Sequence, residues 1–285
     1  MDPDPQDRLV VVLVRARNPS NIGAAARAMH DLGFRHLRIV NEFPVPFQAA
    51  KSAVDASSIL QAAAEFTNVA EAIADCALVY GTTAVGARVL EHPLEILPQA
   101  APAIATALAT ERDSRIALLF GSEKTGLSND ELSHCHRLLT IPMNTPTADR
   151  HLSMNLGQAV AVCLYAIAHA YTPVPHSSQP HRDEWAASEP PAPSADLERL
   201  LTLLRDILTT SGYTRRHPAN SRDPILRRLT RRMMLTTSDA AVWTGILRQL
   251  QHALAGRHLV RDVNKIPPVP SDEESIHDDF SVNNQ

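Results

Sequence analysis

Several motifs are missing from this chain, and each absence removes support for a class of function. The chain has no G-x-x-x-x-G-K-[ST] phosphate loop and no G-x-G-x-x-G after a strand, which disfavours nucleoside triphosphate hydrolysis and an ordinary dinucleotide fold. It also lacks the G-x-S-x-G elbow of a serine hydrolase. No Cys/His set has zinc spacing. His134 and His136 flank Cys135, but adjacent helical residues point about 100° apart and cannot share one ion. We therefore expect no metal.

Some residue types and segments are scarce. Aromatic residues make up only 4% of the chain, which disfavours a protein that stacks many RNA bases on aromatic rings. The three cysteines, Cys76, Cys135 and Cys163, are scattered and odd in number, which indicates a reducing compartment and no disulfide framework. The amino terminus is acidic and lacks the basic region of a secretory signal, and the longest early apolar run is too short to span a bilayer. We expect a cytoplasmic protein without a membrane segment.

The remaining composition fits a globular protein with a sizeable core. The chain has 285 residues, of which 44% are hydrophobic, enough for one large domain or two modest ones. Its formal net charge of −4 is an average that can conceal a basic patch balanced by acidic tails.

Apolar segments alternate with helix-forming segments in the first part of the chain. The predicted strands are 9–14, 36–40, 76–83, 115–121 and 138–143. The predicted helices are 20–32, closed by Gly33, and segments near 49–64, 69–74, 99–109, 128–135 and 153–171. Ser128 and Glu131 have capping-box spacing. Strands that are apolar on both faces and alternate with helices predict an α/β fold with a mostly parallel sheet covered by helices on both sides.

The composition changes after this region. Residues 172–194 are rich in Pro, Ser and Ala and predict a linker. Leucines at spacings of three and four from Leu197 to Leu208 predict an amphipathic helix, which Gly212 ends. Helices near 225–235 and 240–254 complete a small all-α extension, 195–256, and an acidic tail, 257–285, is predicted to be disordered.

Three polar, glycine-containing segments follow or lie near predicted strand ends. They are 80–84, 119–132 and the stretch from 140 to 157 that precedes the long helix. Ligands of open α/β sheets bind at the carboxyl ends of strands, so these segments could form one pocket. On pattern alone, they could equally be ordinary strand-to-helix turns.

These segments, together with Asn18–Met29, resemble the three motifs of the SPOUT class of RNA methyltransferases, in the branch that methylates ribose 2′-hydroxyls. N-x-G-x-x-x-R is matched by Asn21, Gly23 and Arg27. F-G-x-E-x-x-G-L is matched by Phe120, Gly121, Glu123, Gly126 and Leu127. S-x-N-L is matched by Ser153, Asn155 and Leu156. The resemblance covers roughly residues 8–171, and we assign 1–171 to this domain.

The resemblance implies a deep C-terminal trefoil knot, which no composition argument predicts because knots are nearly absent from proteins. It also implies a homodimer whose active sites are each completed by the partner chain, and S-adenosylmethionine bound in the knot. Carried over by position, the cofactor contacts would be Thr82, Thr83, Ala84, Gly121, Ile141, Met143, Leu152, Ser153 and Met154. Leu152 stands where a serine is common in the class, so Ser153 is the only hydroxyl directly before Asn155.

The same resemblance points to Arg27, Ser153, Asn155 and Glu123 as catalytic residues. Since a guanidinium remains protonated in nearly every protein, we interpret Arg27 as a fixed cation at the developing oxyanion and an adjacent RNA phosphate. The alternative for Arg27 is an ordinary i,i+4 ion pair with Asp31. Asn155 could hold the backbone of the knot. Glu123 could orient Arg27 or the ribose, or cap the following turn.

Arginines supply the candidate RNA contacts outside this site. Arg88 is a candidate phosphate contact, although related proteins often have more basic residues near it. Seven arginines lie between Arg215 and Arg232 with one acid, Asp223, giving a local formal charge of about +6. Such a patch is typical of a phosphate-backbone binder. The RNA-binding residues predicted here are Arg227, Arg228, Arg231 and Arg232. The alternative is a solvated helix face balanced by the acidic tail.

The segments 196–218 and 225–247 resemble the helical extension of the TrmJ-type enzymes, which methylate the ribose at position 32 of the tRNA anticodon loop. The resemblance therefore predicts a tRNA ribose 2′-O-methyltransferase that acts on cytidine or uridine. One alternative is a ribosomal RNA 2′-O-methyltransferase of the same fold, because the catalytic motifs do not specify the target. A second is a catalytically silent knotted protein that binds RNA.

Overall fold

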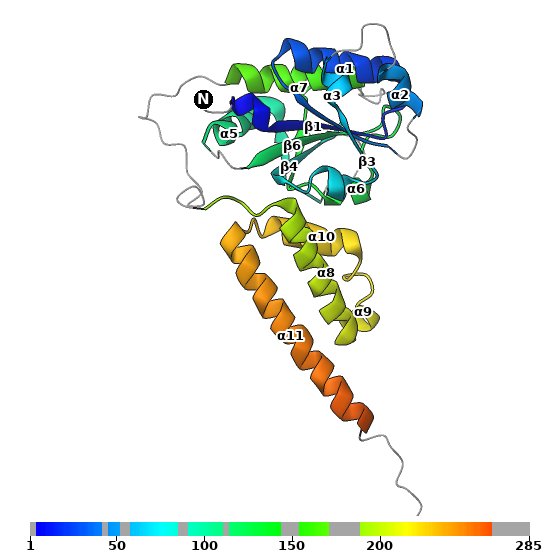
Figure 1. The fold of residues 1–285 in the computed structure, drawn as a ribbon, viewed down its shortest axis with the longest axis vertical. Coiled ribbons are helices and arrows are strands. Elements are labelled where there is room, and N and C mark those ends of the chain that lie inside the picture. Colours follow the sequence, from blue (N-terminus) through cyan, green and yellow to red (C-terminus); the bar gives the residue numbers. More distant parts are fainter. Residues whose placement is uncertain are drawn as a thin grey trace, which may run out of the picture.

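A seven-stranded sheet forms the core of the upper part of the molecule in Figure 1, and the helices of the C-terminal part extend below it. The computed structural model describes residues 4–41, 45–51, 58–84, 91–110, 114–143, 154–170 and 189–263. The strands are β1 (Leu9–Val14), β2 (His36–Val40), β3 (Ala64–Phe66), β4 (Cys76–Thr82), β5 (Leu94–Ile96), β6 (Arg115–Phe120) and β7 (Arg137–Thr140). Their order is β3-β2-β1-β6-β4-β7-β5, and all neighbours are parallel.

The central strand β1 is buried along its whole length, as its sequence LVVVLV predicts. Because side chains alternate between the faces of a strand, β1 contributes to two separate cores. Leu9, Val11 and Leu13 join the cluster on one face, and the alternate valines join the cluster on the other. A parallel sheet needs helices over both faces, and the structure confirms this expectation.

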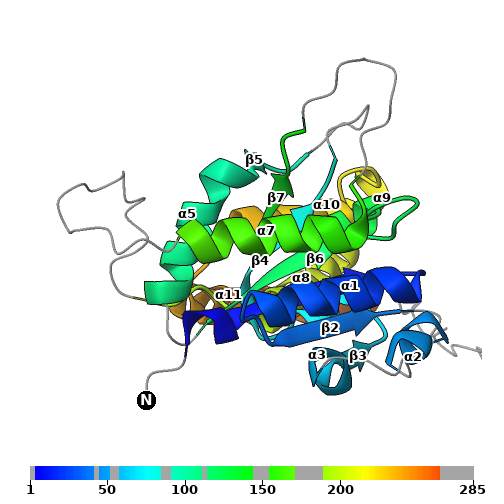
Figure 2. The ribbon, with the colours of Figure 1, turned by 90° about the horizontal axis from the view of Figure 1, so that it is seen from above.

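Helices form a layer on each side of the sheet. The first layer contains α1 (Pro19–Asp31), α2 (Val45–Lys51), α3 (Ser58–Ala62), α5 (Leu97–Thr110) and α7 (Leu156–Ala170). Figure 2 shows α1 and α7 side by side across this face. The opposite face carries α4 (Val69–Ala72) and α6 (Asn129–Ser133). Ser128 caps α6 in the expected capping box with Glu131.

The prediction of one helical stretch near 49–64 was wrong at its end. There the structure has α2, α3 and then β3, which begins at Ala64. The edge strand β5 was not predicted, because its exposed Leu94 and Ile96 form no long apolar run. A short 3-10 helix, η1 (Pro5–Arg8), also precedes β1 without a sequence prediction.

Four further helices follow: α8 (Ser194–Thr210), α9 (Tyr213–Arg216), α10 (Asp223–Arg232) and α11 (Thr237–Val263). The expected amphipathic helix is α8, whose Leu197 and Leu200 share a small core with Leu247 of α11. Gly212, with φ of 76°, follows the end of α8 as predicted, whereas the short helix α9 that begins after it was not predicted. Because α11 continues to Val263, helical structure extends past residue 257, where the tail was expected to begin.

The described end of the expected linker, residues 189–194, is ordered by specific contacts. The Ala192 N–H donates to the Leu235 carbonyl at 2.9 Å, and Ala192 is buried. The Ser194 hydroxyl donates to the Cys76 carbonyl at 2.6 Å. The first contact joins the segment to the residues between α10 and α11, and the second attaches the start of α8 to β4, so this part of the chain is a docking segment rather than a free spacer.

The three cysteines form no disulfide, as the composition indicated. Cys76, Cys135 and Cys163 are free and buried, and burial raises the pKa of each thiol to about 12. Such thiols have little nucleophilic character. Among the described helices, none has the length and apolar character needed to cross a membrane.

Candidate active site

Four loops that carry the motifs leave the same edge of the sheet. Leu13 of β1 is in register with Phe120 of β6, Gly81 of β4 with Leu119 of β6, and Thr82 with Leu139 of β7. Because these strands are adjacent and parallel, their carboxyl ends meet at one edge. The described residues that follow β1, β4, β6 and β7 therefore lie at one edge of the sheet. A pocket formed by 80–84, 119–132 and 140–157 stays a prediction, since residues 144–153 lie outside the described residues.

Glu123, in the loop after β6, binds the start of α1. Its carboxylate accepts hydrogen bonds from the N–H groups of Arg17 and Asn18 at 3.1 and 3.2 Å, and from Nδ2 of Asn21 at 3.0 Å. Partial burial would raise the pKa of Glu123. The hydrogen bonds donated by Asn21, Arg17 and Asn18 have the larger effect, so the pKa of Glu123 is lowered. Glu123 is therefore a carboxylate at neutral pH, which suits an acceptor that joins two motifs.

Asn155 extends this connection to the third motif. Its Nδ2 donates to Oδ1 of Asn21 at 2.8 Å, while its own Oδ1 accepts from the Gly157 N–H at 2.9 Å at the start of α7. The side chains of Asn155, Asn21 and Glu123 thus form one chain of hydrogen bonds between segments more than 100 residues apart. From the sequence, Asn18 and Asn21 were expected to satisfy backbone groups at the start of this helix. Asn18 does so by accepting from the Ser20 N–H, whereas the Asn21 side chain links the other two motifs.

The loop after β6 folds back tightly on Gly121. A Cβ added at Gly121 would lie 2.2 Å from both the Gly126 carbonyl carbon and the Leu127 nitrogen, so no larger residue fits this turn. The Gly126 N–H donates to the Ser122 carbonyl at 2.7 Å, and Gly126 has φ of 66°. The glycines of the second motif are therefore required by the backbone path.

Arg15 supports the same loop, and sequence reasoning missed it. Its Nε and Nη2 donate to the two carboxylate oxygens of Glu131 at 2.6 and 2.8 Å, and Nη2 also donates to the Gly126 carbonyl at 3.1 Å. Glu131 in turn accepts from the Ser128 N–H. Nothing in the local sequence marks this pairing, because its partners lie over 100 residues away.

The described cofactor candidates lie along these strand exits. Thr82 donates through Oγ1 to the Leu119 carbonyl at 2.9 Å, and the Thr83 N–H donates to the Leu139 carbonyl at 2.9 Å. Most of the set is half-buried and Ala84 is exposed; the described members are Thr82, Thr83, Ala84, Gly121, Ile141, Met143 and Met154. Leu152, Ser153 and Arg88 lie outside the described residues.

Within one copy of the chain, Arg27 lies apart from the hydrogen-bonded side chains of Asn21, Glu123 and Asn155. It is exposed on α1, whose buried face consists of Ile22, Ala25, Ala26 and Met29. Six residues separate it from Asn21, which places it about 9 Å further along the helix and on a different face. Asp31 pairs with His30 at 3.2 Å, and within the described chain no ion pair joins it to Arg27. The arrangement leaves this guanidinium facing outward.

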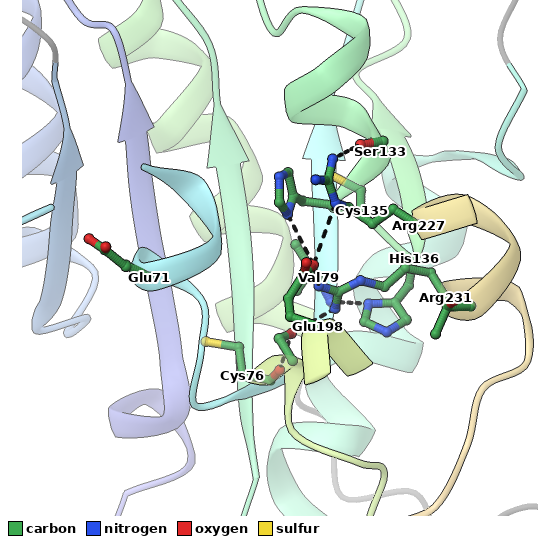
Figure 3. Close-up of polar contacts among 12 residues, drawn as sticks. Glu71, Cys76, Val79, Ser133, Cys135, His136, Glu198, Arg227 and Arg231 are labelled. Atoms are coloured by element: carbon green, nitrogen blue, oxygen red, sulfur yellow. Dashed lines mark hydrogen bonds and ion pairs between the residues drawn. The ribbon is translucent and has the colours of Figure 1, made fainter. Parts of the chain in front are cut away.

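The predicted RNA-binding arginines of α10 turn mainly toward the sheet domain. Arg231 is buried, and its guanidinium donates to Glu198 of α8 at 3.1 Å and to the Ser194 hydroxyl at 2.7 Å (Figure 3). Arg227 donates to Asp130 at 3.1 Å and to Ser133 at 2.7 Å, both at α6. These contacts correct the expectation that Arg227 and Arg231 form an exposed phosphate-binding face.

The other two arginines of this group contact the segment before β5. Arg228 pairs with the Glu91 carboxylate, and 16% of its side chain is exposed. Arg232 donates to the Glu91 carbonyl and remains exposed. These arginines of α10 pair within the protein because Glu198, Asp130 and Glu91 place carboxylates on the inner side of the helix. There the arginines keep their charge and gain an ionic partner.

The histidines that flank Cys135 are also explained by these contacts. His134 Nδ1 lies 3.5 Å from Glu198, whereas His136 Nδ1 accepts from the Val79 N–H at 3.1 Å. Burial lowers the pKa of both imidazoles, with the charge of Arg231 adding to the effect on His136. In the described part of the chain, no three or more His, Cys, Asp or Glu residues come together as metal ligands.

Comparison with known proteins defines the class to which this fold and site belong. A crystal structure of TrmJ from Z. mobilis ZM4 superposes with a TM-score of 0.66 at 32% identity, covering 85% of this chain and 98% of that one. A methylase family protein from Neisseria gonorrhoeae superposes with a TM-score of 0.54 at 28% identity, covering 70% of this chain and 95% of that one. Both superpositions show that these proteins share the fold of this chain over most of its length.

The model of the SpoU rRNA Methylase family matches residues 8–165. The chain belongs to this family and is a methyltransferase. A curated relative from Yersinia pestis (strain Pestoides F), named tRNA (cytidine/uridine-2'-O-)-methyltransferase TrmJ, is 33% identical over 244 residues, 85% of this chain and 90% of the relative. A relative of the same name from Salmonella typhimurium is 33% identical over 250 residues, which cover 87% of this chain and 98% of the relative. The family resemblance inferred from the three motifs is confirmed.

Proposed function

We propose that this chain transfers a methyl group from S-adenosylmethionine to the ribose 2′-hydroxyl of a cytidine or uridine at position 32 of tRNA. The observation that carries the proposal is the hydrogen-bonded chain from Asn155 through Asn21 to Glu123, which unites the three motifs at one edge of the sheet. The names of the relatives that match over most of this chain support a tRNA substrate.

The residues at the strand exits fit the proposed cofactor. Thr82 and Thr83 supply small polar side chains, Ile141 and Met143 supply apolar surface, and Gly121 allows the loop after β6 to turn tightly beside them. Leu152, Ser153, Met154 and Ala84 complete the proposed contacts. When bound, the cofactor supplies an electrophilic methyl group whose leaving group departs neutral, so the reaction needs no metal.

The protein must then align the ribose hydroxyl and stabilise negative charge on its oxygen. We assign the stabilising charge to Arg27, which binds the developing oxyanion and an adjacent phosphate, while the proton leaves to phosphate or water. Glu123 and Asn155 hold the start of α1 in place for this task, and Ser153 supplies a hydroxyl beside Asn155. Arg88 is a further phosphate contact.

The outward position of Arg27 suits a site that is shared between two copies of the chain. In the proposed homodimer, Arg27 of one copy serves the strand-exit loops of the other. The proposal includes the deep trefoil knot of the SPOUT class, the domain division 1–171 and 195–256, and a cytoplasmic location, where tRNA is available.

The test uses the full chain, S-adenosylmethionine with a labelled methyl group, and unmodified tRNA transcripts beside ribosomal RNA. Mass spectrometry of nuclease fragments then maps the methylated nucleotide. Methylation at position 32 of tRNA supports the proposal, whereas methylation of ribosomal RNA alone establishes the alternative target. Cofactor binding without methylation of either RNA would reject the proposed activity, and absence of cofactor binding in calorimetry indicates the silent RNA-binding protein.

Variants of Arg27 test the assigned chemistry. Arg27→Ala should reduce kcat by about 100-fold or more, the usual loss when one oxyanion donor is removed. Arg27→Lys should retain part of the activity because it keeps the positive charge but loses the planar fork of donors. Wild-type activity in Arg27→Ala would remove the residue from the mechanism. The matched control is Arg248→Gln, which removes one positive charge from an exposed position on α11 and should leave kcat unchanged.

A further inference from the structure

The arginine run from Arg215 to Arg232 divides into two groups in the structure. The α10 group, Arg227, Arg228, Arg231 and Arg232, makes ion pairs or hydrogen bonds with α6, α8 or Glu91. The other three, Arg215, Arg216 and Arg222, are exposed. We call this second group the tip arginines, because they lie on α9 and the turn that leads from it to α10.

Among the described residues, the tip arginines contact neutral groups rather than acids. Arg216 donates to the Ser211 carbonyl at 3.3 Å, and Arg222 donates to the Ala219 carbonyl at 3.3 Å. Both acceptors are neutral, and within the described residues no carboxylate forms an ion pair with any tip arginine. A backbone carbonyl orients a guanidinium without cancelling its charge, so the tip arginines keep their positive charge.

The fold of the tip places Arg215 and Arg216 beside the same glycine turn. Gly212 adopts φ of 76° and reverses the chain after α8, so α9 begins immediately. The rings of Tyr213 and His217 pack with centroids 4.6 Å apart and brace this short helix. Arg215 Nη2 lies 3.8 Å from the Cβ position built on Gly212, beside the reversal.

The paired group holds the tip at a defined position relative to the active site. Arg227 binds Asp130 and Ser133 on α6, the helix that directly follows the glycine-containing loop of the second motif. Arg231 binds Glu198 and ties α10 to α8. Figure 1 shows α9 and α6 on the same side of the molecule. An extended RNA that enters the strand-exit loops can therefore reach the tip.

We propose that the tip arginines bind phosphate groups of the RNA substrate, while the arginines of α10 serve to dock the helices that carry the tip. The inference rests on the proposed function only in taking RNA as the substrate. Guanidinium groups bind phosphates through paired N–H donors, and each such contact releases counterions from the RNA. The tip contacts RNA outside the nucleotide that is methylated.

The experiment compares two triple variants of the full chain. The tip variant is Arg215→Gln, Arg216→Gln and Arg222→Gln. The control variant, Arg35→Gln, Arg199→Gln and Arg248→Gln, removes the same charge from exposed arginines elsewhere. Binding of a pool of unmodified tRNA transcripts is measured over a series of salt concentrations, and circular dichroism checks that both variants fold.

In the tip variant, the magnitude of the slope of log K against log salt is expected to decrease by about 2. Each of the three lost phosphate contacts removes somewhat less than one from this slope. At about 0.1 M salt, its Kd for tRNA should rise roughly 10- to 100-fold. KM for tRNA should rise while kcat at saturating tRNA and cofactor affinity stay near wild type, which distinguishes binding from a structural defect. The control variant should keep a slope close to that of the wild type.

Equal slopes and equal affinities for the tip and control variants would overturn the inference, and so would a loss of kcat and cofactor binding without a change in the slope. The proposed function has a separate failure. If the wild-type chain binds tRNA but methylates none of it, the activity is rejected, while the comparison of slopes still decides whether the tip binds RNA.

Discussion

Replacing Glu198 with Gln should destabilise the protein, because this one carboxylate faces two arginines and a histidine between the helical extension and the sheet domain. Its Oε1 lies 3.1 Å from Arg231, 3.6 Å from Arg227 and 3.5 Å from His134. Burial would raise the pKa of Glu198, but the neighbouring His134, Arg231 and Arg227 lower it to about 2. Glu198→Gln keeps the shape and removes the charge, leaving the buried Arg231 without its carboxylate.

The magnitude follows from the difference between the folded and ordinary pKa values. A pKa of about 2 against the ordinary 4.5 corresponds to about 3 kcal/mol at neutral pH. A quarter of the side chain is exposed, so solvent screening makes this an upper value. It agrees with the roughly 3–5 kcal/mol found when one partner of a buried ion pair is removed. The expected decrease in Tm is roughly 5–10 °C.

The effect should depend on pH with a defined sign. Glu198 is ionised above pH 4.5 in the unfolded chain and above about pH 2 in the folded one, so its contribution is complete at neutral pH. It decreases as the pH falls from 4.5 towards 2. The difference in unfolding free energy between wild type and Glu198→Gln should therefore shrink to about 2 kcal/mol near pH 3.5.

Urea denaturation at neutral and acidic pH measures this difference, with Asp206→Asn as the control on the exposed side of α8. A double-mutant cycle adds Arg231→Met, an apolar replacement that removes the buried cation. The double variant should be less destabilised than the sum of the single variants, because neither charge is left alone. A loss below about 1 kcal/mol that is the same at both pH values would refute the reasoning.

Four other variants, at three positions, test the loop after β6 and the packing of α7 on α1. Gly121→Ala should abolish cofactor binding in calorimetry, because its Cβ would lie 2.2 Å from Gly126 and Leu127; wild-type affinity would show that the turn can move. Gly157→Ala should lower the unfolding free energy by about 1–3 kcal/mol, since its Cβ would meet the Cβ of Ala24 at 2.6 Å between α7 and α1; an unchanged denaturation midpoint would contradict this packing. Arg15→Met removes the hydrogen bonds to Glu131 and the Gly126 carbonyl and should weaken cofactor binding about tenfold, with Arg15→Lys intermediate. Equal cofactor affinity in the wild type, Arg15→Met and Arg15→Lys would exclude a role for Arg15 in holding the loop.

The core of the sheet domain was predictable because burial leaves a direct pattern in the sequence. The uninterrupted apolar run of β1 requires cover on both faces, and the capping box at Ser128 and Glu131 marks the start of α6. The short strands β3 and β5 escaped prediction, since Glu65 and Glu95 interrupt any apolar pattern and the strands form by pairing with neighbours at the sheet edges. The three motifs, recognised by resemblance, located the loops of the candidate site.

By itself, the sequence determined the alternation of strands and helices, the position of Gly212 between two helices and the concentration of arginines near the end of the chain. These features depend on local burial, backbone freedom and composition. Only the tertiary structure decided that Asn155 reaches Asn21, that Arg15 binds Glu131 and that Arg231 is buried against Glu198. Each pairing joins distant parts of the chain, and a charge pattern cannot distinguish an arginine paired across an interface from one left free for RNA. That difference depends on which carboxylates the fold brings within reach.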